Sequence, residues 1–462
     1  MKERVVLFIL SAGLVWAVYW LQYRNTIITI IGLLALIFVV VLYVIYSSLA
    51  TRHRNRKLIK NPQILNPDYK PFVTVMIPAH NEDSVISDTI DNVIQMDYPN
   101  FEIIVIDDRS EDNTANVLKQ LEQKYSGKVR ALIRDKSAFP GKSAVLNDAL
   151  KMAGGEAILV FDADARVEKD FLSKLVPYLE PEDTGACQAR KVVSNKDYNF
   201  LTRCQNNEMS LDTYTQVNRD SIKGAVELRG NGELIKRKAL EDIGGWNNET
   251  ITDDLDMSTR LHLKGWDVRF IPEAVVYEEA IIYWGALFRQ RRRWLEGSIR
   301  RYLEYFGDVL TSREMSIRAS LDMTIYIFEF LLPFWFIVEM GFRFLHAFKW
   351  LIGKNPNYSL LSMSNALLLL VSICIAFGFA ETIRKALRKY DNVPRKEALK
   401  QAIETCAYFL LIWFPMMLFI LCKILFCKKS MAWGKTTHGL IKEEEDNLQK
   451  QKQMKETQIG EV

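Results

Sequence analysis

The sequence predicts an α/β domain with a mostly parallel sheet and helices on both faces, flanked by transmembrane helices and interfacial amphipathic helices. Between residues 71 and 280, short β-branched runs alternate with amphipathic helical stretches, a pattern typical of strand-helix-strand units. Long apolar runs without charged residues stand before and after this region. With 49% hydrophobic and 25% charged residues among 462, the chain fits one soluble domain joined to a membrane part.

Residues 1–50 contain the first two apolar runs, Val5–Tyr23 and Thr26–Ala50, which lack Asp, Glu, Lys and Arg. Each run is close to the ~20 residues that cross a bilayer as a helix. We therefore expect a transmembrane hairpin. A cleaved signal peptide is the alternative, but the second run follows almost at once, without an obvious small-x-small cleavage site.

A basic linker, residues 51–70, follows the hairpin. Cations crowd the exit of the second apolar run: Arg52, Arg54, Arg56, Lys57 and Lys60. Clusters of Lys and Arg beside a membrane span favour the cytoplasmic side. We therefore expect a multi-pass protein of the cell membrane, with its N-terminus and the following domain in the cytoplasm.

Residues 71–280 are predicted to form the cytoplasmic domain. Its first strand is Val73–Ile77, and a helix with apolar residues at helical spacing covers Ser84–Met96. A second strand, Ile103–Ile106, precedes a helix around Leu118, and a third strand is Ala157–Phe161. Polar or acidic residues follow all three strands, at the sheet edge where open α/β sheets bind ligands.

Residues 281–318 are predicted to form interfacial amphipathic helices. Aromatic and aliphatic side chains interleave there with arginines: Arg289, Arg291, Arg292, Arg293, Arg300 and Arg301. This composition is typical of helices that lie at the level of the lipid headgroups.

Residues 319–427 are predicted to hold the C-terminal transmembrane segments, roughly 319–341, 359–381 and 403–427. A strongly basic loop between the second and third favours the inside. The number of crossings stays open, because Pro415 interrupts the last segment where a re-entrant turn is an alternative. Residues 428–462 form a cytoplasmic or exposed tail that begins with a Trp-Gly-Lys-Thr segment and ends rich in Glu, Gln and Lys.

Two carboxylates, Asp162 and Asp164, follow the third strand. In extended geometry they point the same way and offer oxygen ligands for Mg²⁺ or Mn²⁺. A helix cap or a solvated loop is the alternative. Asp107 and Asp108 end the preceding strand, where a carboxylate can accept hydrogen bonds from a ribose or a base.

A lysine before a helix is the next candidate. Gly141-Lys142-Ser143 precedes a helical stretch and lets Lys142 and backbone N–H groups face a diphosphate. The motif lacks the full spacing of a phosphate-binding loop and is weak alone.

Asp254 is the candidate general base, because direct displacement at an anomeric carbon needs one carboxylate to deprotonate the acceptor hydroxyl. A single base implies inversion at that carbon. The alternative places Asp253 and Asp254 in the first turn of a helix, where acids favour the helix dipole. Both interpretations are compatible, with Asp253 near the cap and Asp254 reacting.

Gln290, Arg293 and Trp294 share one helix face by their spacing of three and four. The guanidinium can neutralise a departing diphosphate, and the indole can pack against a sugar. A plain Arg and Trp belt at the membrane surface is the alternative.

In this order and beside membrane spans, these motifs resemble the family 2 membrane glycosyltransferases, which include cellulose, chitin, hyaluronan and poly-N-acetylglucosamine synthases. The resemblance covers roughly residues 72–300 and implies a GT-A fold, a UDP-sugar donor and a divalent ion. It implies that Asp162 and Asp164 hold the ion, that Asp254 is the base, and that Gln290, Arg293 and Trp294 clamp diphosphate and acceptor. For the UDP it implies Ala79, Glu82, Asp108 and Lys142, to which we add Asp107. Asp253 stands where many relatives have Glu.

The chain also resembles, more narrowly, the bacterial monoglucosyldiacylglycerol synthases. This likeness is visible in Glu227–Gly232, Glu249–Asp256, Arg260–Leu263 and Trp433–His438. It implies transfer of glucose from UDP-glucose, in β-linkage, to a membrane lipid such as diacylglycerol. A processive synthase of a β-linked polysaccharide is the alternative, and a non-catalytic nucleotide sensor is a third. The cysteines form no C-x-x-C pair, the five histidines are scattered, and a net charge of +4 gives no indication of nucleic acid.

Overall fold

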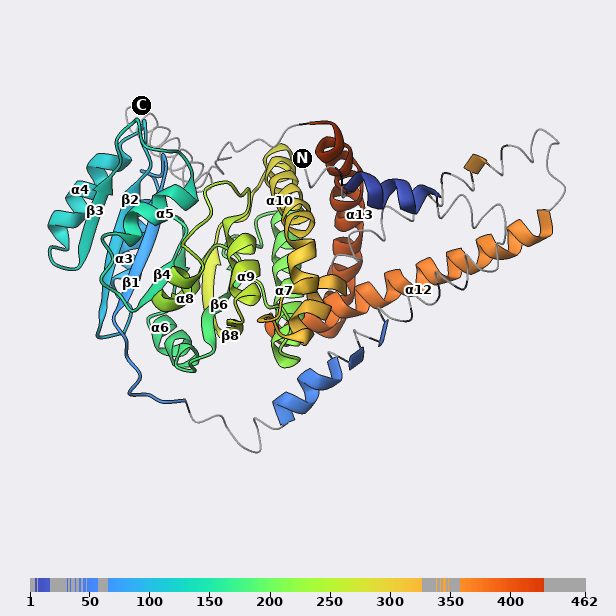
Figure 1. Cartoon of the computed structure of the whole chain (residues 1–462), viewed down its shortest axis with the longest axis horizontal. Coiled ribbons are helices and arrows are strands. Elements are labelled where there is room, and N and C mark those ends of the chain that lie inside the picture. Colours follow the sequence, from blue (N-terminus) through green and yellow to red (C-terminus); the bar gives the residue numbers. More distant parts are fainter. Residues whose placement is uncertain are drawn as a thin grey trace, which may run out of the picture.

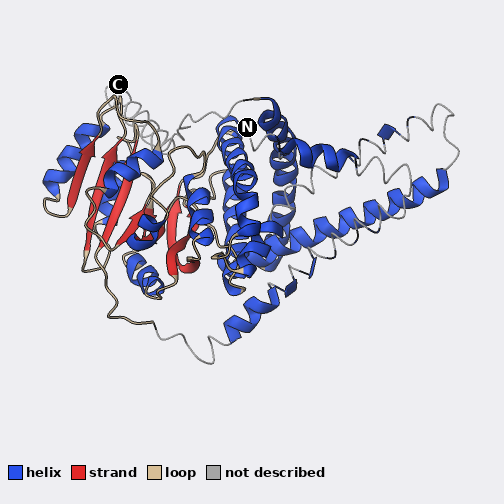
Figure 2. Cartoon of the chain, viewed as in Figure 1, coloured by secondary structure: helices blue, strands red, loops and turns tan. Residues whose placement is uncertain are grey.

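The computed structural model describes residues 7–16, 48–56, 65–325 and 358–427, with isolated positions before residue 48 and between 338 and 348. A twisted sheet lies beside a group of long helices, and α12 extends away from the domain (Figure 1). Figure 2 shows the strands gathered in one body and the helices that cover it. Most of the predicted N-terminal hairpin, the segment 326–337 and the tail 428–462 lie outside the described residues.

Eight strands form one sheet in the order β3-β2-β1-β4-β7-β6-β8-β5. Strands β3, β2, β1 and β4 are mutually parallel, as are β6 and β8, whereas β7 is antiparallel to both of its neighbours and β5 is antiparallel to β8. The strands are β1 Val73–Ala79, β2 Phe101–Asp107, β3 Val129–Ile133, β4 Ala157–Val160, β5 Arg166–Val167, β6 Thr184–Val193, β7 Glu233–Lys236 and β8 Asp267–Glu278.

Helices connect these strands and continue after the sheet. They are α3 Ile86–Val93, α4 Thr114–Lys124, α5 Lys142–Leu150, α6 Phe171–Leu175, the 3₁₀ turn η1 Val176–Leu179, α7 Phe200–Ser221, α8 Arg237–Asp242, α9 Asp253–Leu263, α10 Trp284–Thr311, α12 Tyr358–Tyr390 and α13 Arg395–Phe426. The three predicted strands and the helices after the first two are confirmed, with ends shifted by a few residues.

Alternation along the strands gives the domain two hydrophobic cores. Val75 and Ile77 of β1 face a core closed by α3, α4 and α6, whereas Met76 between them faces a second core closed by α5, α8 and α9. Successive side chains of a strand point to opposite faces, so one sheet separates the two cores. The prediction of helices on both faces is confirmed.

Helix α7 joins the sheet to the C-terminal helices, because it packs against β6 and β8 on one side and against α12 and α13 on the other. The expected interfacial region is largely one continuous helix, α10, and it packs into this group rather than standing apart. Three of its arginines, Arg291, Arg300 and Arg301, are buried. Those guanidinium groups pair with carboxylates of the protein, of which Glu227 and Glu296 are buried and Glu208 is partly buried.

The expected basic loop after residue 381 is mostly helical, since α12 runs to Tyr390 and α13 begins at Arg395. Helix α13 continues through Pro415, so no re-entrant turn forms there. Within the described residues, Arg395–Phe426 is the one helix whose length and apolar composition suffice to cross a bilayer, and Leu7–Trp16 is a shorter apolar helix.

The turn between α12 and α13 is fastened to the domain by Asp391. Its carboxylate pairs with Arg190 of β6 and accepts hydrogen bonds from Ser210 and Asn206 of α7. The side chain of Asp391 is 5% exposed and that of Arg190 is 11% exposed. A buried pair of this kind strongly destabilises a protein when one partner is removed, because the other charge stays behind.

We therefore expect Asp391→Ala to destabilise the protein by about 3–5 kcal/mol, since Arg190 would lose its counter-ion. The measurement is the apparent unfolding temperature of detergent-solubilised protein, followed by tryptophan fluorescence. The matched control is Asp170→Ala, which removes an exposed carboxylate 2.8 Å from Lys174 and should change little. Equal unfolding temperatures for the two variants would contradict a stabilising role of Asp391.

Candidate active site

The carboxyl ends of β1, β2 and β4 meet at one edge of the sheet, as their parallel pairing requires. The backbone N–H of Asp108, just after β2, donates to the carbonyl of Ala79 at the end of β1 at 2.8 Å. Beyond Ala79, the N–H of Glu82 donates to Thr114 Oγ1 at 2.8 Å, and its carbonyl accepts the first bonds of α3. The predicted nucleotide-binding residues of the first two strands are thus neighbours.

The two aspartates that follow one another at the end of β2 have different surroundings. Asp108 is fully buried, and its carboxylate pairs with Arg134 at 2.6 Å and with Arg109 at 2.9 Å. It also accepts from the N–H of Gly141 at 3.3 Å. Asp108 therefore anchors the loop before α5. Asp107 is buried as well, and its Oδ1 has no hydrogen-bond partner among the described residues, which leaves it able to accept a ligand's hydrogen bond.

Lys142 begins α5, as its place after Gly141 suggested, and Gly141 takes the positive φ of 112° that a side chain would disfavour. The ammonium lies 2.6 Å from Asp162 Oδ1 and donates to the carbonyl of Gly230 at 2.8 Å. Burial disfavours the charged form, but the carboxylates of Asp162 and Asp253 outweigh it and raise the pKa of Lys142. The lysine stays protonated and draws these elements together.

Asp162 and Asp164 follow β4, as predicted. Asp162 is partly buried and paired with Lys142, whereas Asp164 is buried and its Oδ2 accepts from the N–H of Glu279 at 3.1 Å. The described residues contain no group of three or more His, Cys, Asp or Glu arranged to hold a metal. The chain turns at these residues, since the N–H of Ala165 donates to the carbonyl of Asp162 at 3.1 Å, and it does not have the extended geometry expected. Carboxylates remain the kind of ligand that Mg²⁺ or Mn²⁺ takes when substrate phosphates and water complete its shell.

Asp253 and Asp254 lie in the first turn of α9, so the helix-terminus interpretation is correct for the backbone. Asp254 also faces the site. A Cβ added at Gly230 would lie 3.3 Å from Asp254 Oδ2 and 3.7 Å from Lys142 Nζ, so both groups border the same glycine. Burial, reinforced by the neighbouring charge of Asp253, raises the pKa of Asp254 to about 6.

Gln290, Arg293 and Trp294 occupy the first half of α10 and are partly buried. The Trp294 ring is contacted by two cations, with Arg291 4.1 Å and Lys191 5.7 Å from its centroid. Gln290 accepts a hydrogen bond from Arg291. Arg293 forms no ion pair within the described part of the chain.

Comparisons with known proteins identify the family. A family described as "Glycosyltransferase like family 2" matches residues 70–297. A beta-monoglucosyldiacylglycerol synthase of Trichormus variabilis is 36% identical over 371 residues, which are 80% of this chain and 76% of the relative. The chain belongs to glycosyltransferase family 2.

Two further relatives differ in how much of the chain they match. A beta-monoglucosyldiacylglycerol synthase of Synechocystis is 35% identical over 81% of this chain and 76% of its own length. A poly-beta-1,6-N-acetyl-D-glucosamine synthase of Staphylococcus epidermidis is 28% identical over 53% of this chain and 59% of its own length. Among solved structures, a Pyrobaculum calidifontis mannosyltransferase in complex with GDP-mannose and Mn²⁺ has a TM-score of 0.54 at 20% identity, and it covers 89% of this chain and 99% of its own. That likeness supports the GT-A fold.

The site of this family 2 enzyme contains two titratable residues that the sequence did not single out. Lys191 of β6 lies 2.8 Å from Glu278 of β8; burial disfavours its charge, but Glu278 and Asp162 raise its pKa. Glu233 of β7 is fully buried, and burial raises its pKa to about 8, with Lys142 opposing the rise. Neither residue stands after one of the predicted strands, and no motif marks them.

In this glycosyltransferase, helix α10 packs very close to the start of helix α9. A Cβ at Gly297 would lie 2.3 Å from Thr252 Cγ2 and 2.7 Å from Thr252 Oγ1. Atoms that close would overlap, so a side chain at position 297 would push α10 away from the turn that carries Asp254. The glycine therefore sets the distance between the two helices of the site.

We expect Gly297→Ala to lower glycosyl transfer by roughly ten- to a hundredfold, because small displacements of reacting groups cost rates of this size. The matched control is Gly307→Ala in the same helix, where nothing lies within 4 Å of an added Cβ. The double variant Gly297→Ala/Thr252→Ala should recover part of the activity, since it removes the two closest atoms and leaves Thr252 Cβ at 3.0 Å. Initial rates of UDP release check all three. No recovery in the double variant would argue against the clash.

Proposed function

We propose that this protein transfers glucose from UDP-glucose, in β-linkage and with inversion, to a membrane lipid such as diacylglycerol. Two beta-monoglucosyldiacylglycerol synthases align with four fifths of the chain, which favours a lipid acceptor. The observation that carries the chemistry is the position of the Asp254 carboxylate. This carboxylate borders Gly230 together with Lys142, and Lys142 is itself paired with Asp162. The proposed base, Asp254, therefore lies next to the proposed diphosphate site.

At the donor end, the nucleotide would lie along the edge formed by Ala79, Glu82 and Asp107. The unpartnered Oδ1 of Asp107 suits a donor group of the base or ribose, and Asp108 supports the loop before Lys142. The Lys142 ammonium would accept the diphosphate charge. Asp162 and Asp164 would hold a divalent ion, which neutralises diphosphate charge when bound.

In the reaction, the acceptor hydroxyl oxygen attacks the anomeric carbon while the bond from that carbon to the UDP oxygen breaks. Asp254 takes the hydroxyl proton, and UDP departs from the opposite face, so the configuration inverts. Asp253 lies beside the base and raises its pKa, which makes Asp254 a stronger proton acceptor once ionised. Arg293 would stabilise the leaving diphosphate.

On the acceptor side, Trp294 and Gln290 would pack against the entering alcohol. The proposed path for a lipid runs along α13, whose apolar residues Leu410, Leu411 and Phe426 are more than 60% exposed. A helix with such a surface favours a bilayer environment. We propose a multi-pass protein of the cell membrane with the catalytic domain on the cytoplasmic side.

Product analysis tests this function. Purified full-length protein with UDP-glucose, diacylglycerol and Mg²⁺ or Mn²⁺ should yield a lipid carrying a single hexose, extracted into organic solvent and identified by mass spectrometry. Chelation of the divalent ion should stop UDP release. Asp254→Asn should lower transfer by about 10²–10⁴-fold, the usual contribution of a general base, and retain UDP binding.

Other outcomes of this assay identify the alternatives. A hexose polymer as the sole product would contradict lipid transfer and favour a processive synthase. Transfer that is unchanged in Asp254→Asn would reject the proposed base.

The pH dependence tests the base separately. Asp254 must be ionised to accept a proton, so kcat/KM should fall as the pH drops below about 6, the raised pKa of its carboxyl. Asp253→Asn removes a neighbouring negative charge that raises this pKa, and it should move the acid limb of the profile to lower pH. An acid limb that does not move in Asp253→Asn would show that another group controls it.

A further inference from the structure

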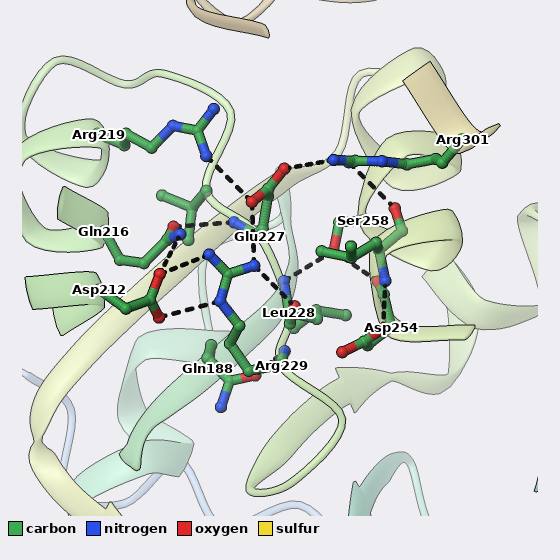
Figure 3. A network of polar contacts seen from close by, with 12 residues as sticks. Gln188, Asp212, Gln216, Arg219, Glu227, Leu228, Arg229, Asp254, Ser258 and Arg301 are labelled. Carbon is green, nitrogen blue, oxygen red and sulfur yellow. Dashed lines mark hydrogen bonds and ion pairs between the residues drawn. The ribbon is translucent and has the colours of Figure 1, made fainter. Parts of the chain in front are cut away.

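One buried carboxylate near the site has no role in the mechanism above. Glu227 is 1% exposed. Arg301, Tyr302 and Arg229 donate hydrogen bonds to its carboxylate, and Arg219 forms an ion pair with it; Figure 3 shows the three arginines around it. Arg301 and Tyr302 of α10 lie 2.7 and 3.0 Å from its Oε1. Arg229 and Arg219 lie 3.0 and 3.2 Å from its Oε2. The contacts bring α7, α10 and the loop 227–232 to one point.

The charge of Glu227 is maintained by this arrangement. Burial disfavours the carboxylate form, but Arg301, Arg219 and Arg229 outweigh burial and hold the pKa of Glu227 well below its usual range. Their guanidinium groups are buried or partly buried too. Removing the carboxylate would leave several cations close together in a low dielectric, where they repel each other strongly.

From this point, two connections lead to the helix that carries the base. Arg301 also donates to Thr259 Oγ1 at 3.0 Å and to the carbonyl of Leu255 at 3.4 Å, both on α9. Next to Glu227, the N–H of Leu228 donates to Ser258 Oγ at 2.7 Å, and Ser258 Oγ donates to the carbonyl of Asp254 at 2.7 Å (Figure 3).

A third connection leads to the donor side. The loop that begins at Glu227 continues to Gly230, whose carbonyl accepts the Lys142 ammonium. Gly230 has a φ of +75°, and its Cα faces the Asp254 carboxylate. The loop thus touches the base on one side and the lysine on the other, and its starting point is fixed by the charge pairs of Glu227.

We propose that Glu227 is a positioning residue that sets the separation between Asp254 on α9 and Lys142 on α5. It acts through Arg301 and the loop 227–232 and does not touch the reacting atoms. This inference rests on the proposed function, since it assigns Asp254 as base and Lys142 as donor ligand. Loss of Glu227 should therefore reduce the rate of the chemical step more than the binding of donor.

The test uses Glu227→Gln in the full-length protein in lipid nanodiscs, with UDP-glucose and diacylglycerol as substrates. We expect kcat to fall roughly ten- to a hundredfold, the cost of misplacing reacting groups by about an ångström. The KM for UDP-glucose should stay within about twofold, because the donor ligands themselves are intact. A loss of folded protein alone would lower the amount of active enzyme and would leave kcat per folded molecule unchanged.

The matched control is Asp212→Asn. Asp212 pairs with Arg229 at 2.6 Å and is 30% exposed. Among the described residues it forms no hydrogen bond or ion pair with Arg301 or with α9, so kcat should stay within about twofold. A decrease in Glu227→Gln no larger than in this control would overturn the proposal. A rise in KM at unchanged kcat would overturn it too, because Glu227 would then act in donor binding.

A second variant, Arg301→Lys, decides the matter if Glu227→Gln does not fold. A lysine keeps the charge but cannot reach Glu227 and α9 together. The same fall in kcat would support the proposal, and an unchanged kcat would overturn it. Wild-type protein that makes no glucolipid would instead reject the proposed function, whereas active wild type with a silent Glu227→Gln would reject the positioning role alone.

Discussion

Helix α7 imposes the constraint on which the rest of the structure depends, because it is buried and yet mostly polar. Its buried residues include Gln205, Asn206, Asn207 and Arg219. A buried polar group without a partner costs free energy, so every element that packs on α7 must supply a donor or an acceptor. Thr405 of α13 supplies one to Asn207. Directional contacts of this kind permit one arrangement of the sheet against the C-terminal helices.

The same requirement explains the arginines of α10. Arg291 donates to Glu208 of α7 at 2.9 Å, and Tyr408 of α13 donates to the same carboxylate oxygen at 2.9 Å. Glu296 of α10 pairs with Lys423 of α13. In the sequence, the many arginines of α10 indicated a lipid interface. In the structure, some of them form ion pairs inside the protein. Periodicity alone does not distinguish these two roles, since both place charge on a helix with apolar neighbours.

Strands β1, β2 and β4 of the first half of the sheet could be predicted because they are mostly apolar and are followed by polar or acidic residues. Strand β3, which carries Arg130, was not predicted. The second half could not be predicted, since β6 carries Gln188, Arg190 and Lys191 and so lacks an apolar run. Of the candidate site residues, Asp107 lies at the end of β2, Asp162 lies just after β4, and Trp294 lies on helix α10, as expected from strand ends and helical spacing. Spacing could not separate buried Asp108, saturated by Arg134, from Asp107. Lys191 could be found only once β6 was known to lie beside β8.

The pairing of α7 and α10 with α13 has a practical consequence for protein engineering. Because the predicted membrane segments begin near residue 319, truncation near residue 318 is the obvious way to obtain a water-soluble catalytic fragment. Such a fragment would keep Arg190 and Glu296 but discard their counter-ions Asp391 and Lys423, so it would present uncompensated charge on a newly bared face. Preparations that retain the C-terminal helical hairpin in a membrane mimetic preserve the surface against which the catalytic half folds.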